Sequence, residues 1–170
     1  FDTAMFNQSY MAAWTLNTDF KSERLDRSAH PILVPCQLYK TKDGWIYIMC
    51  NKESFWPVLC KKLGREDLID NSKFVDFSSR QKHRDEITKI LDEELMKKNT
   101  SKWLDEFGGV VPAAPILNLK ESLENPFLKD RKNIQKLKTK RGVDISLLKT
   151  PVHVSDSKFQ DKTAPELGED

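Results

Sequence analysis

An Asp-Gly pair at residues 43 and 44 constrains this chain more than any other short feature, because it stands between two runs of apolar and aromatic residues. A two-residue type I′ turn needs positive φ at both central positions, and Asp-Gly is among the pairs that adopt it most readily. The pair therefore predicts a β-hairpin. With this turn, Tyr39 lies opposite Ile48, Leu38 opposite Met49, and Lys40 opposite Tyr47.

A helix is predicted directly after the hairpin. Apolar residues recur at helical spacing from Phe55 onward, and Gly64 is typical of a helix end. Pro57 lacks an N–H and is tolerated only in the first turn, so we expect Ser54 to be the N-cap. Residues 50–53, Cys-Asn-Lys-Glu, then form an exposed loop in front of the helix.

The remaining elements are predicted from periodicity and from turn residues. We expect a helix over 2–19, an amphipathic helix over 79–98, a short helix capped by Thr100 and stopped by Gly108-Gly109, an extended segment over 110–118, helical turns over 119–130, and two strands over 132–154 that turn at Arg141-Gly142. This order predicts a small α+β fold: a β-hairpin plus helices and a C-terminal strand pair, with extended linker segments.

The composition gives no indication of a highly charged partner such as nucleic acid or a membrane surface. Charged residues make up 32% of the 170 residues and the formal net charge is +2, so neither nucleic acid nor membrane is expected as a partner. No apolar run approaches the roughly 18 residues of a spanning helix, and the first residues lack the pattern of a secretory signal. The three cysteines and three histidines show no metal-ligand spacing, so we expect no metal site. Sparse cysteines favour reduced thiols in a cytoplasmic protein.

The loop at 50–53 places a thiol, an amide, an amine and a carboxylate in consecutive positions. A nucleophilic cysteine needs a base and a lowered pKa, and no histidine is predicted near Cys50. A structural thiol is therefore the favoured interpretation, with a nucleophile as the alternative. His30, which precedes Pro31, is more typical of a connector residue that caps or packs than of a catalytic base. His83 is predicted to pack beside an apolar helix stripe.

Two charged stretches have competing interpretations. Residues 129–142, "KDRKNIQKLKTKRG", hold seven basic residues. Strand alternation would spread these charges over two faces, and no aromatic residue is interleaved, which favours a solvated edge strand over a phosphate-binding segment. Asp92-Glu93-Glu94 point around a helix rather than at one spot, and with Lys97 and Lys98 in register they predict a solvated face.

Several segments, taken together and in order, resemble the class III CoA-transferases, the family that includes formyl-CoA transferase, carnitine CoA-transferases and alpha-methylacyl-CoA racemase. The segments are "FDTAM" at 1–5, "AHPILVPCQLYKTKDGWIYIMCN" at 29–51, "FWPVLCKKLGREDLIDNSKF" at 55–74, "SRQKHRDEITKILDEEL" at 79–95, "TSKWLDEF" at 100–107, "VVPAAPILNLKESLENP" at 110–126 and "TAPELGED" at 163–170.

The resemblance implies a fragment of a two-part fold, with a large Rossmann-like domain and a smaller α+β domain. Residues 1–32 resemble the exit helix of the large domain and its linker, 33–130 the small domain, and 131–170 the returning strands and linker. In the family, an aspartate of the large domain attacks the acyl-CoA thioester. No position in this chain corresponds to that aspartate, so we expect no catalytic residue here and an inactive fragment.

The resemblance also implies substrates and a role for the loop. The substrates are an acyl-CoA and a small organic acid, with coenzyme A bound mostly by the missing domain, no metal, and a homodimer at full length. In the family, the loop after the second hairpin strand shields the acyl intermediate, although here it is not glycine-rich. The implied substrate-facing residues are Tyr39, Met49, Cys50, Asn51, Lys52 and Glu53. Lys52 and Asn51 favour a dicarboxylic or hydroxy-dicarboxylic acyl group. A racemase fragment and a non-catalytic interaction module are the alternatives.

Overall fold

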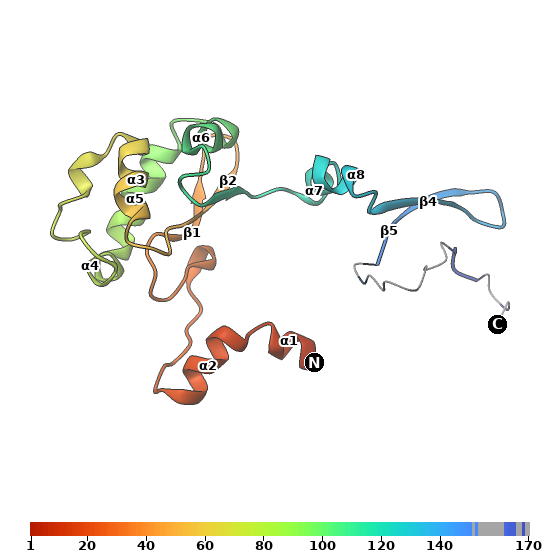
Figure 1. Ribbon diagram of the computed structural model, residues 1–170, viewed down its shortest axis with the longest axis horizontal. Coiled ribbons are helices and arrows are strands. Elements are labelled where there is room, and N and C mark those ends of the chain that lie inside the picture. The colour runs from red at the N-terminus through yellow and green to blue at the C-terminus, as the bar shows by residue number, and fades with distance from the viewer. Residues whose placement is uncertain (151, 153–161, 166–167, 169–170) are drawn as a thin grey trace. The chain divides into compact units, whose positions relative to one another are not determined.

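The structure is a computed structural model that describes residues 1–150, 152, 162–165 and 168. The chain divides into two compact units, Phe1–Ile116 and Leu117–Asp170 (Figure 1). The predicted domain limits after residues 32 and 130 stay predictions. Residues 151, 153–161, 166, 167, 169 and 170, which belong to the predicted returning segment, lie outside the described residues.

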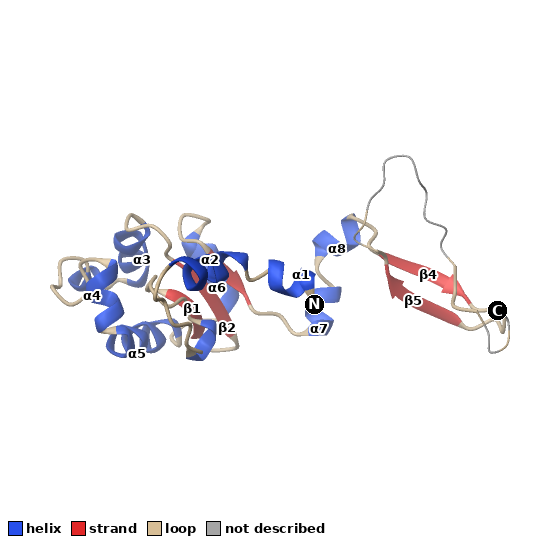
Figure 2. Cartoon of the chain, turned by 90° about the horizontal axis from the view of Figure 1, so that it is seen from below, coloured by secondary structure: helices blue, strands red, loops and turns tan. Residues whose placement is uncertain are grey.

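The first unit is an α+β fold, as predicted. Its elements are α1 (Asp2–Phe6), α2 (Ser9–Asn17), the 3-10 turn η1 (Asp26–Ser28), β1 (Cys36–Lys40), β2 (Trp45–Met49), α3 (Phe55–Leu63), η2 (Glu66–Leu68), α4 (Phe77–Lys82), α5 (Arg84–Leu95), α6 (Thr100–Phe107) and β3 (Ala113–Pro115). Strands β1, β2 and β3 form one antiparallel sheet in that order. The helices α3, α4 and α5 lie to one side of β1 and β2 (Figures 1 and 2).

One core joins the sheet to these helices. Helix α5 lies against β1, and α6 lies against β3 and α3. Tyr39, Ile46 and Ile48 of the hairpin have no exposed surface, nor have Leu59 of α3 and Leu91 of α5. Burial of these large apolar side chains, at about 25 cal/mol for each Å² removed from water, holds the helices on the sheet.

The hairpin is confirmed, but its predicted turn and register are wrong. Tyr39 lies opposite Ile46, Leu38 opposite Tyr47, and Lys40 opposite Trp45, so each partner is displaced by two residues. The loop is longer than two residues, and Gly44 is not among the positive-φ residues of the described chain. A displacement of two residues keeps every side chain on its predicted face, because side chains alternate with a period of two.

The turn differs because Asp43 has a partner far along the chain. Its Oδ1 accepts hydrogen bonds from the backbone N–H of Thr100, at 2.8 Å, and from the Thr100 hydroxyl, at 3.0 Å. The backbone N–H of Gly44 donates to Thr41 Oγ1 at 3.1 Å, which closes the loop from within. Asp43 therefore caps α6 from another element, and this tertiary contact outweighs the local preference for a type I′ turn.

Replacing Asp43 by asparagine is expected to lower the melting temperature at neutral pH and to make little difference in strong acid. The bonds from Thr100 lower the pKa of Asp43 from its ordinary value of 3.8. The stabilisation is thus present above the unfolded-state pKa and is lost as the pH falls through the folded-state pKa. Thermal melts of the two proteins from pH 7 to pH 2 would measure this. A constant difference across the range would contradict the assignment.

The predicted helices are mostly confirmed, with different limits. Helix α3 begins after Ser54 and ends at Gly64, which is left-handed with φ 70°. The helix predicted over 79–98 is broken at His83 into α4 and α5. The helix predicted over 2–19 is two short helices. The N-cap of α6 is Asn99 rather than Thr100, because Thr100 is already the first helical residue.

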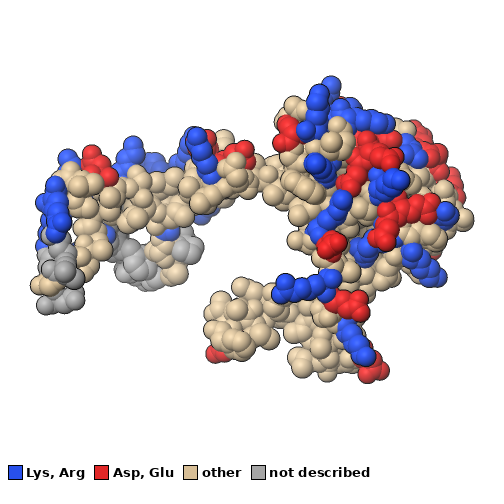
Figure 3. All heavy atoms as spheres, turned by 180° about the vertical axis from the view of Figure 1, so that it is seen from behind, with Lys and Arg blue, Asp and Glu red and all other residues tan. Residues whose placement is uncertain are grey.

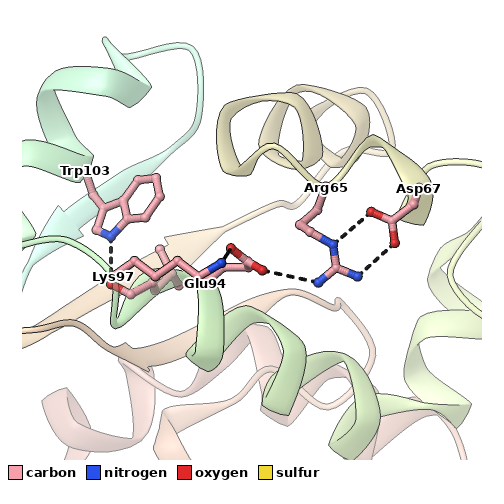
Figure 4. Close-up of polar contacts among 6 residues, drawn as sticks. Arg65, Asp67, Glu94, Lys97 and Trp103 are labelled. Atoms are coloured by element: carbon pink, nitrogen blue, oxygen red, sulfur yellow. Dashed lines mark hydrogen bonds and ion pairs between the residues drawn. The ribbon is translucent and has the colours of Figure 1, made fainter.

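The solvated face predicted around Glu94 is wrong for that residue. Glu94 is buried, and its carboxylate lies 3.4 Å from Arg65 Nη1 and 2.5 Å from Lys97 Nζ. Arg65 in turn binds Asp67 through two N–H groups at 2.8 Å (Figure 4). The helix-surface pattern misses this contact because Arg65 comes from the segment that follows α3, outside the helix.

Helices α1 and α2 contribute no buried residue. The exposed fractions of Phe1, Phe6 and Leu16 are 97%, 76% and 81%. Few charged side chains cover this segment, which is drawn almost entirely in tan, the colour of uncharged residues, in Figure 3. This helical pair therefore has no core of its own. Its assignment to the exit helix of a larger domain stays a prediction.

The second unit contains α7 (Leu119–Leu123), α8 (Pro126–Asp130), β4 (Ile134–Lys138) and β5 (Asp144–Leu148). The helical turns and the strand pair are confirmed, and Gly142 in the turn has φ 80°. The predicted spreading of the basic charges over two faces is wrong for β4. Lys136 and Lys138 are two residues apart, so they lie on the same face of the strand.

Candidate functional site

The predicted loop at 50–53 lies between β2 and α3 and is held at both ends. The Cys50 N–H donates to Pro35 O at 2.9 Å, which continues the hairpin by one bond. Glu53 Oε1 accepts from the backbone N–H of Phe77 at 2.7 Å, and its Oε2 accepts from Arg80 Nη2. The loop is therefore anchored to the segment before β1 and to α4, and it is not a free connection.

Arg80 is the anchor of this arrangement, and its side chain has no exposed surface. Its Nε donates to Val34 O at 2.6 Å and its Nη1 donates to Phe74 O at 2.7 Å. The guanidinium lies 5.0 Å from the ring centre of Trp56 and 4.8 Å from that of Phe77. Hydrogen bonds and cation–π contacts thus replace the water that this buried cation has lost.

The tip of the loop points its polar groups outward. Asn51 and Lys52 are exposed, and within the described part of the chain neither side chain forms a hydrogen bond or an ion pair. Met49, the last residue of β2, is 42% exposed beside them. The arrangement presents an amide, a primary ammonium group and a thioether to a ligand from a rigid base.

Tyr39 and Cys50, both predicted to face substrate, lie in the core instead of at this tip. Neither has exposed surface. Burial raises the pKa of the Cys50 thiol to about 12, although the positive charge of Arg80 opposes the shift. Burial likewise raises the pKa of Tyr39 well above its usual value. A thiol in this state is not a nucleophile at neutral pH, so the structural interpretation of Cys50 is supported.

The cysteines are expected to resist alkylation in the folded protein. Burial raises the pKa of Cys60 to about 12 and that of Cys36 above its ordinary value. At pH 8, iodoacetamide should modify the native chain at least about a hundredfold more slowly than the chain in urea, because little thiolate is present. Mass spectrometry of quenched samples would measure this. Rapid labelling of Cys50 in the native chain would contradict its buried placement.

His30 and His83 cap or pack as predicted. His30 Nδ1 accepts from the backbone N–H groups of Ile32, at 3.1 Å, and Leu33, at 2.9 Å, which places its proton on Nε2. Burial and the neighbouring Arg84 lower the pKa of His30. His83 lies edge-on to Phe74, with ring centres 6.3 Å apart.

A polar cavity of about 560 Å³ lies between the connector 24–29, β1 and α5, apart from the loop at 50–53. Arg84, Gln37 and Thr88 line it, and an Arg27–Asp92 ion pair at 2.7 Å lies among its walls. Its basic and acidic residues are nearly balanced, so the cavity does not indicate a charged ligand.

Among the described residues, no group of three or more His, Cys, Asp or Glu could hold a metal ion. Within the same part of the chain, each helix is too short or too polar to cross a membrane.

The sequence and the fold of this chain are similar to those of known proteins. A family model described as CoA-transferase family III matches residues 1–170. The chain belongs to this family. The resemblance identified from the seven ordered segments is therefore confirmed.

Two curated relatives of this family III chain are CoA-transferases by name. The succinyl-CoA:glutarate CoA-transferase of Homo sapiens is 34% identical over 141 residues, which are 82% of this chain and 32% of that protein. The succinate–glutarate CoA-transferase of Agrobacterium fabrum is 26% identical over 144 residues, 84% of this chain and 36% of that protein. The family III chain thus spans about a third of the length of these relatives.

A solved structure shares the fold. The crystal structure of a CaiB/BaiF family protein from Brucella suis superimposes with a TM-score of 0.78 and 27% sequence identity. The match covers 95% of the family III chain and 42% of that protein. Like the curated relatives, this protein is much longer than the segment that it shares with the family III chain.

Sequence reasoning missed the residue that holds the loop of the family III chain. Arg80 stands in "SSRQKHR", where polar neighbours on both sides are typical of a solvated helix. Phe74 and Phe77 close before it give a weak signal, because aromatic residues flank buried guanidinium groups. The pairing with Glu53, 27 residues away, leaves no local pattern.

Proposed function

We propose that this family III chain forms the small-domain part of a CoA-transferase, which moves CoA between an acyl-CoA and a small carboxylic acid once a large domain is present. Family membership and the names of the relatives support the reaction class. The chain's share of its relatives' length supports a division of the active site between this part and another. The relatives named above are transferases, which favours transfer over racemisation and over a non-catalytic interaction module.

The loop at 50–53 is proposed to be the small-domain edge of the acyl site. The observation that carries this proposal is the contrast between its anchored ends and its exposed tip. Glu53 and Cys50 are hydrogen-bonded to the rest of the fold, while Lys52 and Asn51 have no side-chain partner among the residues that the structure describes. A rigid base is what a shield over a reactive acyl intermediate requires, because the intermediate must be kept from water.

The chemistry of the tip suggests the substrate class. An ammonium group binds a carboxylate through charge-assisted hydrogen bonds, and the Asn51 amide can donate to a second oxygen. We therefore propose that Lys52 binds the distal carboxylate of a dicarboxylic acid or acyl group, while Met49 contacts its carbon chain. The names of the two curated relatives, which specify succinate or succinyl-CoA and glutarate, support this class. Homodimerisation at full length and a cytoplasmic location stay predictions.

Replacing Lys52 by glutamine is expected to lower kcat/KM for dicarboxylic acceptors about tenfold, the loss of one charge-assisted hydrogen bond. With monocarboxylic acceptors the change should stay within about twofold, because these acids lack the distal carboxylate. CoA transfer would be measured on the gene product at full length, with succinyl-CoA as donor and glutarate or butyrate as acceptor.

The matched control is Lys61→Gln, which removes one positive charge from the exposed side of α3, away from the loop. It should leave both acceptors unaffected. Equal losses with glutarate and butyrate in the Lys52 variant would refute the substrate assignment. Failure of the full-length protein to transfer CoA between any acyl-CoA and acid would refute the reaction itself. The 170-residue chain alone should be inactive.

A further inference from the structure

The polar cavity between the connector 24–29, β1 and α5 is lined by side-chain groups that have no partner among the described residues. Every residue of its wall belongs to the Phe1–Ile116 unit, and the structure describes this unit without a gap. The volume of about 560 Å³ is sufficient for a small organic molecule. Because the basic and acidic residues of the wall nearly balance, the individual polar groups, rather than the net charge, must indicate the ligand.

Arg84, the first residue of α5, has a donor group without an acceptor. Its Nη2 donates to His30 O at 2.8 Å and to Pro31 O at 3.0 Å, which holds the guanidinium in the cavity wall. Its Nη1 is buried and has no hydrogen-bond acceptor among the described residues. Both bonds use Nη2, so a slight rotation of the guanidinium would bring Nη1 to the cavity without breaking them. A carboxylate is the acceptor that best matches the planar N–H groups of arginine.

Gln37 and Asp85 supply acceptors to the same cavity. Gln37 is 2% exposed, and its Nε2 donates to Thr88 Oγ1 at 3.1 Å, while its amide oxygen accepts no hydrogen bond from the described residues. Asp85 is exposed and forms no ion pair within the described part of the chain. An amide oxygen and a carboxylate both accept from an ammonium group, which has three N–H donors.

The other charged residues of the wall contribute less. Arg27 and Asp92 are paired with each other at 2.7 Å. Arg24, Asp26 and Lys89 have exposed side chains, and charges surrounded by water interact weakly with a ligand. The unpaired donor of Arg84 and the unpaired acceptors of Gln37 and Asp85 therefore dominate recognition.

We propose that this cavity binds a small zwitterion of the α-amino-acid class, with its carboxylate on Arg84 and its ammonium group directed to Asp85 and the Gln37 amide. Such a ligand adds no net charge to a wall whose charges nearly cancel. An anion would leave the acceptors of Gln37 and Asp85 unused, and a cation would leave Nη1 of Arg84 without an acceptor. The cavity lies apart from the loop at 50–53, so the proposal does not depend on the proposed transferase reaction.

Nuclear magnetic resonance titration of the 170-residue chain with L-alanine tests the proposal. Amide resonances of Gln37, Thr88 and residues 24–29 should shift to saturation, with a dissociation constant of about 1 mM or lower. Propionate lacks the ammonium group of alanine, and ethylammonium lacks its carboxylate. Each analogue should bind at least about tenfold more weakly, because one charge-assisted interaction is lost. Shifts that do not saturate, or propionate binding as tight as that of alanine, would overturn the proposal.

Two variants assign the two ends of the ligand. Asp85→Asn should weaken alanine binding about three- to tenfold and leave propionate binding unchanged, because this acid contacts only the ammonium group. Arg84→Lys keeps the positive charge but removes Nη1, so it should weaken the binding of both alanine and propionate about tenfold. Circular dichroism would verify that both variants fold. Asp85 is exposed, so its variant gives a decisive result even if Arg84→Lys unfolds.

The matched control is Glu93→Gln, which neutralises an exposed acid on α5 that does not line the cavity. It should bind alanine as the unaltered chain does. An Asp85→Asn protein that bound alanine as tightly as this control would refute the assignment, as would an equal loss of affinity in both variants.

Discussion

Replacing Arg80 by methionine is expected to lower the free energy of unfolding of the Phe1–Ile116 unit by about 3–5 kcal/mol. Methionine fills much of the same volume but supplies no donor. Val34 O and Phe74 O would be left buried without their hydrogen bonds, and Glu53 would lose its cationic partner. Each unpaired buried carbonyl costs about 1–3 kcal/mol, so an apolar replacement of the cation does not compensate.

Urea denaturation followed by tryptophan fluorescence would measure this loss, because all four tryptophans lie in the Phe1–Ile116 unit. Glu53→Gln should cost less, about 1–2 kcal/mol, since that side chain is half-exposed and water can replace part of the contact. Lys61→Gln serves as the surface control and should change stability by less than about 0.5 kcal/mol. An Arg80→Met protein as stable as this control would show that the guanidinium does not anchor the loop.

Replacing Trp103 by alanine is expected to lower the free energy of unfolding by a similar amount, about 3–5 kcal/mol, for a different reason. Trp103 is 2% exposed on α6 and stacks on Phe107, with ring centres 5.7 Å apart. Its Nε1 donates to Leu95 O at 2.7 Å, at the end of α5, and the Lys98 ammonium lies 4.2 Å from the ring centre (Figure 4 shows the indole). Alanine would leave a cavity and an unpaired carbonyl together.

Two further variants separate these contributions. Trp103→Phe keeps most of the ring but removes the N–H, so it should cost less, about 1–2 kcal/mol. Trp45→Ala tests the same residue type at a surface position, because Trp45 is 39% exposed, and its cost should be the smallest of the three. The same urea titrations would rank them. If Trp45→Ala were as costly as Trp103→Ala, burial would not explain the effect.

Short-range chemistry was sufficient to predict most elements of the fold. Pro57 and Gly64 marked the two ends of α3 correctly, since a missing N–H and a left-handed residue each act within one turn. The hairpin register was not predictable in this way. Asp43 accepts hydrogen bonds from Thr100 instead of forming the local type I′ turn, and Thr100 lies 57 residues further along the chain. Local pattern therefore predicted the strands and their faces but misplaced the pairing.

The candidate site, like the fold, was predictable where nearby residues determine the structure and unpredictable where a distant partner does. Proline at position 57 put the loop outside the helix, which places Lys52 at an exposed tip as expected. The family resemblance implied that Glu53 faces the substrate, whereas its carboxylate accepts hydrogen bonds from Arg80 and from the backbone N–H of Phe77. The chemistry of a side chain shows which groups it can bind, but the partner that it does bind depends on the assembled fold.

The Asp43–Thr100 contact also affects the order in which the first unit folds. A hairpin with a two-residue type I′ turn can form from adjacent residues alone, within microseconds. This hairpin instead has its loop completed by the N-terminus of α6, so closure requires a long stretch of chain to be ordered first. The loop should therefore form late, together with the docking of α6. Because its closing contact joins residues far apart in the sequence, this step should slow folding.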